Sequence, residues 1–175
     1  RPNERWSMDF VSDQLAAGRR LKCFTLVDDC SRESPVIEVS HSITGCHVVE
    51  ILNRIKAKRS LPQVIVCDNG PEFTSKALDE WAHWNNVKLD FIDPGKPVQN
   101  AYIESFNGKF RDECLNQNIF FDLGDARQKI EDWRIDYNTE RPHSSLGNET
   151  PETFAKLHQP MLPEKTGACE VMTGP

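Results

Sequence analysis

The sequence of 175 residues lacks any apolar run approaching the ~20 residues that a helix needs to cross a bilayer. Its first ten residues, RPNERWSMDF, also lack the apolar segment of a secretory signal. We therefore expect neither a membrane span nor a secretory leader. The N-terminus is interpreted as a cut made at a domain boundary.

Cysteine pairs with metal-ligand spacing are absent as well. None of the six cysteines forms a C-x-x-C pair, and the five histidines are dispersed, so a zinc site is not expected. The cysteines lie among apolar segments, where a free thiol behaves as a small hydrophobic group. We expect reduced thiols at Cys23, Cys30, Cys46, Cys67, Cys114 and Cys169.

Positive charge is scarce: 21 Lys and Arg residues face 27 Asp and Glu residues, which gives a formal net charge of −6. A basic domain is the usual footprint of bulk nucleic-acid binding, so this balance argues mildly against it. An enzyme that gathers carboxylates around metal ions is compatible with the charge, because the metals restore local positive charge. The 38% apolar content predicts an ordinary globular domain with a core.

The first third of the chain alternates apolar and polar residues, which is typical of strands. In RWSMDFV, Met8 and Phe10 fall on one side of the strand and Asp9 falls on the other. Two more strands are predicted at residues 21–29 and 34–40. Three strands at such short spacing indicate an antiparallel meander.

The period then changes to that of amphipathic helices alternating with short apolar strands. Helices are predicted over about 45–59, after Ser75, over about 103–114, from Asp122 and from Pro151, with further strands at 63–68 and 87–92. This order predicts an α/β fold with a mixed five-stranded sheet, three antiparallel strands followed by parallel ones, and helices on both faces. Residues 1–158 are expected to form one catalytic core and residues 159–175 a loosely ordered tail.

Three carboxylates occupy positions that suit chemistry. Asp68 ends the central strand in VCDNGPEF, Asp9 lies within the first strand, and Glu104 falls in the first turn of a helix after a Pro/Gly loop. Carboxylates brought together repel one another, and a hard divalent cation is the usual remedy. Two such ions ~3.5–4 Å apart can stabilise the attacking and leaving oxygens of a phosphoryl displacement.

Several motifs resemble the catalytic core of bacterial insertion-sequence transposases, a group related to retroviral integrases in the DDE integrase-core superfamily. They are W-S-M-D-F, C-D-N-G-P-E-F, P-G-K-P-V-Q-N-A-Y-I-E-S-F-N-G, Y-N and R-P-H-S-S-L-G, spread over about residues 3–158. Asp68 and Glu104 are separated by 35 residues, 104 − 68 − 1, as in that family. The resemblance implies an RNase H-like fold and a Mg²⁺- or Mn²⁺-dependent polynucleotidyl transferase that nicks an element end and joins its 3′-OH to another phosphodiester.

By this resemblance Asp9, Asp68 and Glu104 are the catalytic metal ligands, with two ions in the active complex. The basic residue that the family places seven positions after the glutamate falls on Arg111. Candidate DNA contacts are Arg111, Lys109, Lys96, Asn69 and Asn100. Gly108 costs its helix about 1 kcal/mol relative to alanine. Close approach of DNA and internal packing are two open reasons for it.

The resemblance also implies partners and a location. DNA, both element ends and target, is the expected substrate of a homodimer or higher oligomer, in the bacterial cytoplasm and on the nucleoid when bound to DNA. Relatives carry an upstream helix-turn-helix region, which is expected to be absent from this chain. A nuclease that only hydrolyses and an inactive DNA-binding remnant remain alternatives. A phospho-receiver domain fits poorly, because it begins with parallel βα alternation.

Other polar residues have plainer interpretations. Asp28 and Asp29 follow a strand and are expected to shape a turn, with support of the active site as the alternative. Glu72 is expected to cap the next helix or face solvent. His143 is expected to anchor its loop, with DNA contact as the alternative. The basic residues Arg54, Lys56, Lys58 and Arg59 are expected to form a solvated face, with target-DNA binding as the alternative.

Overall fold

A computed structural model describes residues 1–93 and 100–158 of the chain. The candidate DNA contact Lys96 and the expected tail at 159–175 lie outside the described residues. Within the described part, no helix is both long and apolar enough to cross a membrane.

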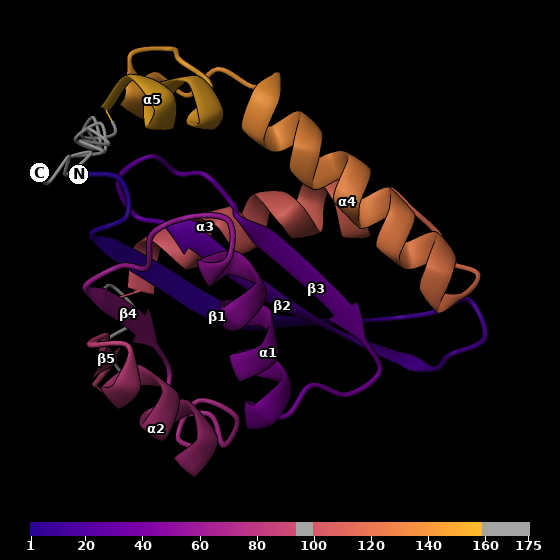
Figure 1. Ribbon diagram of the computed structural model, residues 1–175. Coiled ribbons are helices and arrows are strands. Elements are labelled where there is room, and N and C mark those ends of the chain that lie inside the picture. Colours follow the sequence, from indigo (N-terminus) through magenta and orange to yellow (C-terminus); the bar gives the residue numbers. More distant parts are fainter. Residues whose placement is uncertain (94–99, 159–175) are drawn as a thin grey trace, which may run out of the picture.

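The centre of the fold is a five-stranded mixed sheet with the order β3-β2-β1-β4-β5 (Figure 1). The strands are β1 (Arg5–Gln14), β2 (Arg20–Asp28), β3 (Val36–Ser40), β4 (Val64–Cys67) and β5 (Lys88–Phe91). β1, β2 and β3 pair antiparallel, whereas β4 runs parallel to both β1 and β5. The predicted meander followed by parallel strands is confirmed.

Helices cover both faces of this sheet, as the sequence predicts. They are α1 (Gly45–Lys56), α2 (Lys76–Trp84), α3 (Ala101–Phe110), α4 (Leu123–Thr139) and α5 (Pro151–His158), with the short turns η2 (Arg111–Leu115) and η3 (Ser144–Leu146). Side-chain oxygens of Thr44, Ser75 and Asp122 accept hydrogen bonds from the first turns of α1, α2 and α4. Such caps satisfy backbone N–H groups that have no partner inside the helix.

Two apolar clusters lie on opposite faces of the sheet. One packs α1 and α2 against Trp6, Met8 and neighbouring strand residues, and the other packs α3 and α4 against Val11 and its neighbours. Because strand side chains alternate between faces, Asp9 points to the same side as Val11, toward α3. The alternation of β1 therefore places the Asp9 carboxylate on the α3 face.

The helix predicted to run through Cys114 changes character at Arg111. Residues 111–115 form a π-helical turn, and the Asn116 N–H donates to the Arg111 carbonyl at 2.8 Å. In an i→i+5 turn the fifth residue returns toward the same face. Phe110, Cys114 and Leu115 are consequently all buried against one core.

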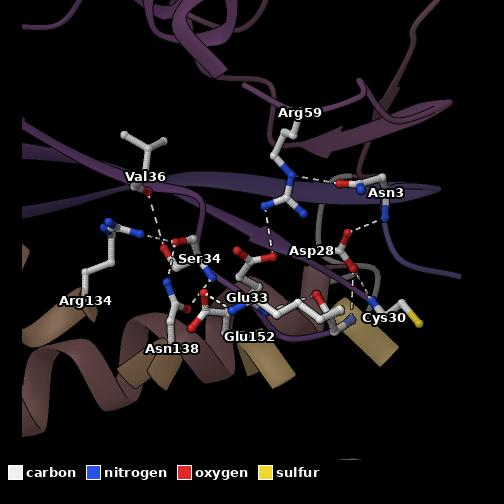
Figure 2. Close-up of polar contacts among 12 residues, drawn as sticks. Asn3, Asp28, Cys30, Glu33, Ser34, Val36, Arg59, Arg134, Asn138 and Glu152 are labelled. Atoms are coloured by element: carbon white, nitrogen blue, oxygen red, sulfur yellow. Dashed lines mark hydrogen bonds and ion pairs between the residues drawn. The ribbon is translucent and has the colours of Figure 1, made fainter. Parts of the chain in front are cut away.

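The outer edge of the sheet is covered by side chains of α4. Arg127 Nε donates to the Val39 carbonyl at 2.9 Å. Asn138 accepts from the Ser34 N–H and donates to the Ser34 carbonyl, both at 2.9 Å, and Arg134 donates to that carbonyl at 2.7 Å (Figure 2). An unpaired strand edge invites pairing with another chain, so these contacts protect β3.

Candidate active site

Asp9 is half-buried in β1 and its carboxylate is held at both oxygens. One oxygen accepts from the N–H of Phe10 at 2.7 Å, and the other accepts from the side-chain amide of Asn107 at 2.9 Å. Thr25, directly opposite Asp9 on β2, donates its hydroxyl to Asn107 Oδ1 at 2.9 Å. This chain of bonds fixes the Asp9 side chain between the sheet and α3.

Asn107 and Thr25 were not among the residues expected at the site. Asn107 lies three positions after Glu104, so both project from neighbouring parts of the same side of α3. That spacing is the one signal in the sequence that could have drawn attention to it. The contact between Thr25 and Asn107 spans 82 positions and has no local signature.

Asp68 follows β4 directly, where the chain leaves the sheet. Its Oδ1 accepts from the N–H of Gly70 at 2.8 Å, and the N–H groups of Phe73 and Thr74 then close onto the Gly70 carbonyl. A Cβ on Gly70 would lie 2.9 Å from Asp68 Oδ1, closer than Cβ atoms normally approach. Glycine therefore lets the turn fold back against the carboxylate, and Asp68 shapes this turn.

Glu72 neither caps α2 nor stands alone in solvent. It forms an ion pair with Lys22 of β2, whose ammonium lies 4.0 Å from the centroid of the Phe10 ring. Phe10 in turn stacks on Phe73 with 4.8 Å between ring centroids. The α2 cap is Ser75. This cluster fastens the turn after Asp68 to the strand that carries Asp9.

Glu104 is exposed in the first turn of α3, three positions before Asn107, which donates to Asp9. Burial raises the pKa of the Asp9 carboxyl above its ordinary value, and the charges of Asp68 and Glu104 raise it further. Hydrogen bonds from Phe10 and Asn107 oppose that rise in pKa. Three carboxylates from separate elements thus act on one region of the molecule.

The carboxylates are neighbours without converging on a single point. Among residues 1–93 and 100–158, no group of three or more His, Cys, Asp or Glu side chains is arranged to hold a metal ion. The charges of Asp68 and Glu104 still affect the pKa of Asp9, because electrostatic interactions act over longer distances than metal coordination does. Asp9 and Asp68 each bind a backbone N–H of their own segment instead.

The candidate DNA contacts lie at different places around α3. Arg111 sits at the end of the helix with its guanidinium 3.5 Å from the Ser12 carbonyl, and Lys109 is exposed on another face. Asn69 donates its amide to the Ile92 carbonyl at 2.9 Å, which ties the ends of β4 and β5 together. Asn100 is buried at the start of α3, and its Oδ1 has no hydrogen-bond partner among residues 1–93 and 100–158.

The remaining candidates have structural contacts. Asp28 is fully buried and accepts from the N–H groups of Asn3, Cys30 and Ser31 (Figure 2), so it shapes the turn after β2 as expected. His143 is buried and packs edge-on against Tyr137 with ring centroids 5.0 Å apart. Its backbone bonds to the backbone of Glu149 at 3.0 Å. These contacts suit the anchoring role expected for His143.

Asp29 and three of the four basic residues in 54–59 also have partners within the protein. The Ser7 hydroxyl donates to Asp29 at 2.6 Å, and Arg5 pairs with the same carboxylate at 3.0 Å. Arg54 pairs with Glu38, Arg59 pairs with Glu33, and Lys56 donates to Asn85. These partners favour the interpretation of 54–59 as a structural surface.

The five cysteines in the described part of the chain are free thiols. Burial raises the pKa of the Cys67 thiol to about 12, and the negative charges of Asp68 and Asp90 add to the rise. Cys23 and Cys114 also have a pKa raised by burial to about 12. Thiols with such a pKa are poor nucleophiles, which supports their expected role as apolar packing groups.

The fold and the site define a class of protein: an RNase H-like α/β domain that gathers carboxylates at β1, at the end of β4 and at the start of α3. A solved structure of the HTLV-2 integrase catalytic core domain in complex with magnesium, in its trimeric form, superposes with a TM-score of 0.70. It is 19% identical, and the match covers 88% of this chain and 97% of that one. This likeness confirms the predicted fold.

The chain belongs to the integrase core domain family, which matches residues 1–97 and, through a second matching segment, residues 85–151. An uncharacterized 31.7 kDa protein of insertion element IS407 from Burkholderia multivorans is 54% identical over 158 residues, 90% of this chain and 57% of the relative. The transposase for insertion sequence element IS904 of Lactococcus lactis is 29% identical over 96 residues, 54% of this chain and 38% of the relative. The chain thus spans about half the length or less of these curated relatives.

Proposed function

We propose that this chain is the catalytic core of a DNA transposase, a metal-dependent polynucleotidyl transferase. The observation that carries the proposal is the placement of three carboxylates: Asp9 on β1, Asp68 at the end of the parallel neighbouring strand β4 and Glu104 in the first turn of α3. The charges of Asp68 and Glu104 both raise the pKa of Asp9, in keeping with this placement. Membership of the integrase core domain family supports it. Asp9, Asp68 and Glu104 are the proposed catalytic residues and metal ligands.

The donor set suits a hard divalent cation. Three carboxylates offer only oxygen ligands, which Mg²⁺ and Mn²⁺ prefer, and their mutual repulsion would fall when a cation binds between them. Burial and two neighbouring negative charges disfavour the ionised form of Asp9, so a cation bound there would stabilise that form. When bound, two such ions would supply Lewis-acid stabilisation of the scissile phosphate and its attacking and leaving oxygens.

The chain's own residues hold this set in place. Asn107 and Thr25 orient Asp9 from the α3 side, while Gly70 allows the turn that bears Asp68 to fold tightly. Arg111 lies at the end of the same helix as Glu104 and would contact a phosphate of bound DNA. Positioning of this kind supplies much of the catalysis in phosphoryl transfer.

The proposed reaction has two steps with the same chemistry at phosphorus. In the first, a water oxygen bonds to phosphorus and the bond to the 3′ oxygen breaks, which leaves a 3′-OH and a 5′-phosphate. In the second, that 3′-OH oxygen attacks a phosphodiester of the target, and a target 3′ oxygen leaves with a proton. Both steps need an in-line arrangement, which a rigid β1, β4 and α3 framework can provide.

Substitution of Asp68 by asparagine tests the assignment. Asn has nearly the same shape and can still accept from Gly70, but it cannot supply a negative charge. We expect at least a hundredfold loss of joining between a pre-cut DNA end and a target plasmid in the presence of Mn²⁺. The same change at Asp132, an exposed carboxylate on α4, is the matched control and should leave joining intact.

Three outcomes would redirect the proposal. Joining by Asp68→Asn at the control rate would contradict the assignment of the metal ligands. Nicking without any joining by the unsubstituted protein would favour the RNase H-like nuclease that only hydrolyses. DNA binding without either activity would favour the inactive remnant.

The proposal extends to assembly and location. Two element ends must be handled together, so we propose a homodimer or higher oligomer on DNA that acts in the bacterial cytoplasm, at the nucleoid. The related HTLV-2 core domain has been solved in dimeric and trimeric forms, which supports self-association as a property of similar folds. Sedimentation with and without element-end DNA would measure it directly.

A further inference from the structure

A basic pocket lies on the side of α3 turned away from Asp9. It has a volume of ≈340 Å³ and lies between α3, the turn after β2 and the loop that carries His143. Its lining includes Arg32, Tyr102, Lys109, His143 and Ser145. Clefts of about 300 Å³ and more are large enough to hold part of a small ligand.

The helical repeat places this pocket and the carboxylates on opposite sides of one helix. Asn107 reaches Asp9, whereas Tyr102 and Lys109, two turns apart, line the pocket. A helix with its side chains is about 10–12 Å in diameter, so the pocket lies about one helix width from the carboxylates. A DNA strand bound at the carboxylates would need little extra length to reach it.

The pocket brings positively charged side chains together, and none of the described residues that line it carries a carboxylate. Among the described residues, neither Arg32 nor Lys109 forms an ion pair with a carboxylate. The guanidinium of Arg32 donates to the Asp29 carbonyl, and Asp29 itself is already paired with Arg5. Arg141, also nearby, differs in that Glu113 and Asp136 pair with it.

The effect of these cations on His143 shows that their fields overlap in the pocket. Burial lowers the pKa of His143 to about 4, and the charges of Lys109, Arg32 and Arg141 add to the fall. His143 is therefore neutral near pH 7 and adds no charge of its own. In a chain of net charge −6, cations gathered in a pocket with no carboxylate in its described lining are a feature that an anionic ligand would satisfy.

An aromatic ring stands at the same place. The Arg32 guanidinium lies 3.8 Å from the centroid of the Tyr102 ring, and Tyr102 remains 46% exposed. A ring held by a guanidinium on one side and open to solvent elsewhere is a platform on which a base can stack. Cations beside such a platform match the two parts of a nucleotide, its phosphate and its base.

Another pocket, between β3, α1, α4 and α5, lacks this combination. It has a volume of ≈460 Å³ and is also lined by cations, but most of them are paired within the protein. Arg54 pairs with Glu38, Arg59 with Glu33 (Figure 2) and Lys156 with Glu152. Unpaired charge beside an exposed aromatic ring therefore distinguishes the pocket behind α3.

We propose that the pocket formed by Arg32, Tyr102 and Lys109 binds an unpaired nucleotide of a DNA strand, with its phosphate at the two cations and its base on the tyrosine ring. The site rests on the proposed function, because its ligand is the strand that passes the carboxylates on the other side of α3. It would hold the strand beyond the reacting phosphate. The proposal gives Lys109 a phosphate contact in this pocket, which is distinct from the phosphate contact proposed for Arg111.

Binding of a fluorescent single-stranded oligonucleotide of about 16 nucleotides, followed by anisotropy in EDTA over a range of salt concentrations, tests the site without any metal. Arg32→Gln and Lys109→Gln should each weaken binding and lower the salt slope by about 0.7, the share of one phosphate contact on a single strand. Tyr102→Ala should weaken binding by roughly 5- to 100-fold through lost stacking. Lys56→Gln, an exposed lysine on the opposite layer, is the charge-matched control.

Affinity and salt slope equal to those of Lys56→Gln in all three variants would overturn the site. Unchanged affinity in Tyr102→Ala alone would overturn the stacked base. Equal competition by inorganic phosphate at the same phosphate concentration would show a free-anion pocket and overturn the assignment to DNA. Melting curves confirm that each variant is folded, and because binding is read in EDTA, failure of this site is separate from failure of Asp68→Asn in joining.

Discussion

At the scale of single residues, the site depends on contacts between positions far apart in the chain. Asp9 is oriented by Asn107, 98 positions away, and the turn after Asp68 is tied to β2 through Lys22 and Glu72, 50 positions apart. Asp68 could be predicted because a short motif surrounds it. Its supporting residues could not, since their roles arise only when the strands and α3 are brought together.

His143 shows how a residue's surroundings set its chemistry. Its expected role is that of a loop anchor, whereas its lowered pKa depends on burial and on the charges of Lys109, Arg32 and Arg141, of which the first two come from distant segments. The motif R-P-H-S-S-L-G, which contains His143, gave no indication of that electrostatic environment. A titratable group buried in its neutral form links the stability of the fold to pH.

We predict that His143 makes the protein less stable below neutral pH. The unfolded chain takes up a proton near pH 6.5 but the folded chain only near pH 4, so this contribution is complete above pH 6.5 and is lost as pH falls to about 4. At about 1.4 kcal/mol per pKa unit, the difference of about 2.5 units (6.5 − 4) corresponds to a loss of about 3 kcal/mol by pH 4. Urea denaturation between these pH values measures it.

The variant His143→Gln isolates this contribution from those of the acidic residues. The difference in unfolding free energy between the unsubstituted protein and the variant should shrink as pH falls through the window. A difference for His143 that stays constant with pH would contradict the prediction.

At the scale of elements, apolar periodicity predicted the order of strands and helices, because each element buries one face against a core. It could not predict the π-helical turn at 111–115, which depends on how Cys114 and Leu115 both reach that core. Apolar periodicity also could not predict the contacts that α4 makes near the edge of the sheet at β3. Those contacts join side chains to backbone groups about 90 to 100 positions away.

Two glycines distinguish internal packing from approach of a ligand. A Cβ on Gly108 of α3 would meet no heavy atom of the described residues within 4 Å, so internal packing does not explain this glycine. A Cβ on Gly45 of α1 would clash with the side chain of Ser75. Close packing of α1 against the start of α2 therefore requires glycine at position 45, whereas α3 would be more stable with alanine at position 108.

We predict opposite effects on stability for the two alanine variants. Gly108→Ala should stabilise the protein by up to about 1 kcal/mol, the difference in helix propensity. Gly45→Ala should destabilise it by about 1–3 kcal/mol because the core contact is overfilled. Thermal unfolding measures both changes in stability. Fluorescence anisotropy with labelled DNA should show weaker binding by Gly108→Ala than by the unsubstituted protein if DNA approaches the helix backbone there. Loss of stability in Gly108→Ala, or unchanged DNA binding, would contradict this account.

At the scale of the whole molecule, a chain of net charge −6 is proposed to act on a polyanion. The distribution of charge resolves the conflict. Carboxylates on one side of α3 would be offset by divalent cations, while unpaired cations gather on the other side of the same helix. Net charge alone could not predict this arrangement, since it requires knowing which residues share a face.

The fold class was predictable from element order together with the family resemblance, and the sheet order and structural neighbours confirm it. The metal ligands remain a proposal at this scale. They come from β1, from the end of β4 and from α3, and their carboxylates are coupled electrostatically without converging on one point. Convergence upon binding a cation is therefore the central claim.

The measurement that tests this claim most directly is an anomalous-scattering map of crystals soaked in Mn²⁺, with Asp68→Asn crystals as the control. We predict a Mn²⁺ peak about 2.0–2.5 Å from carboxylate oxygens of Asp9 and Asp68, with Glu104 turned toward it, and loss of that peak in the control. A saturating soak that places Mn²⁺ elsewhere, or leaves these three carboxylates without a peak, would contradict the account.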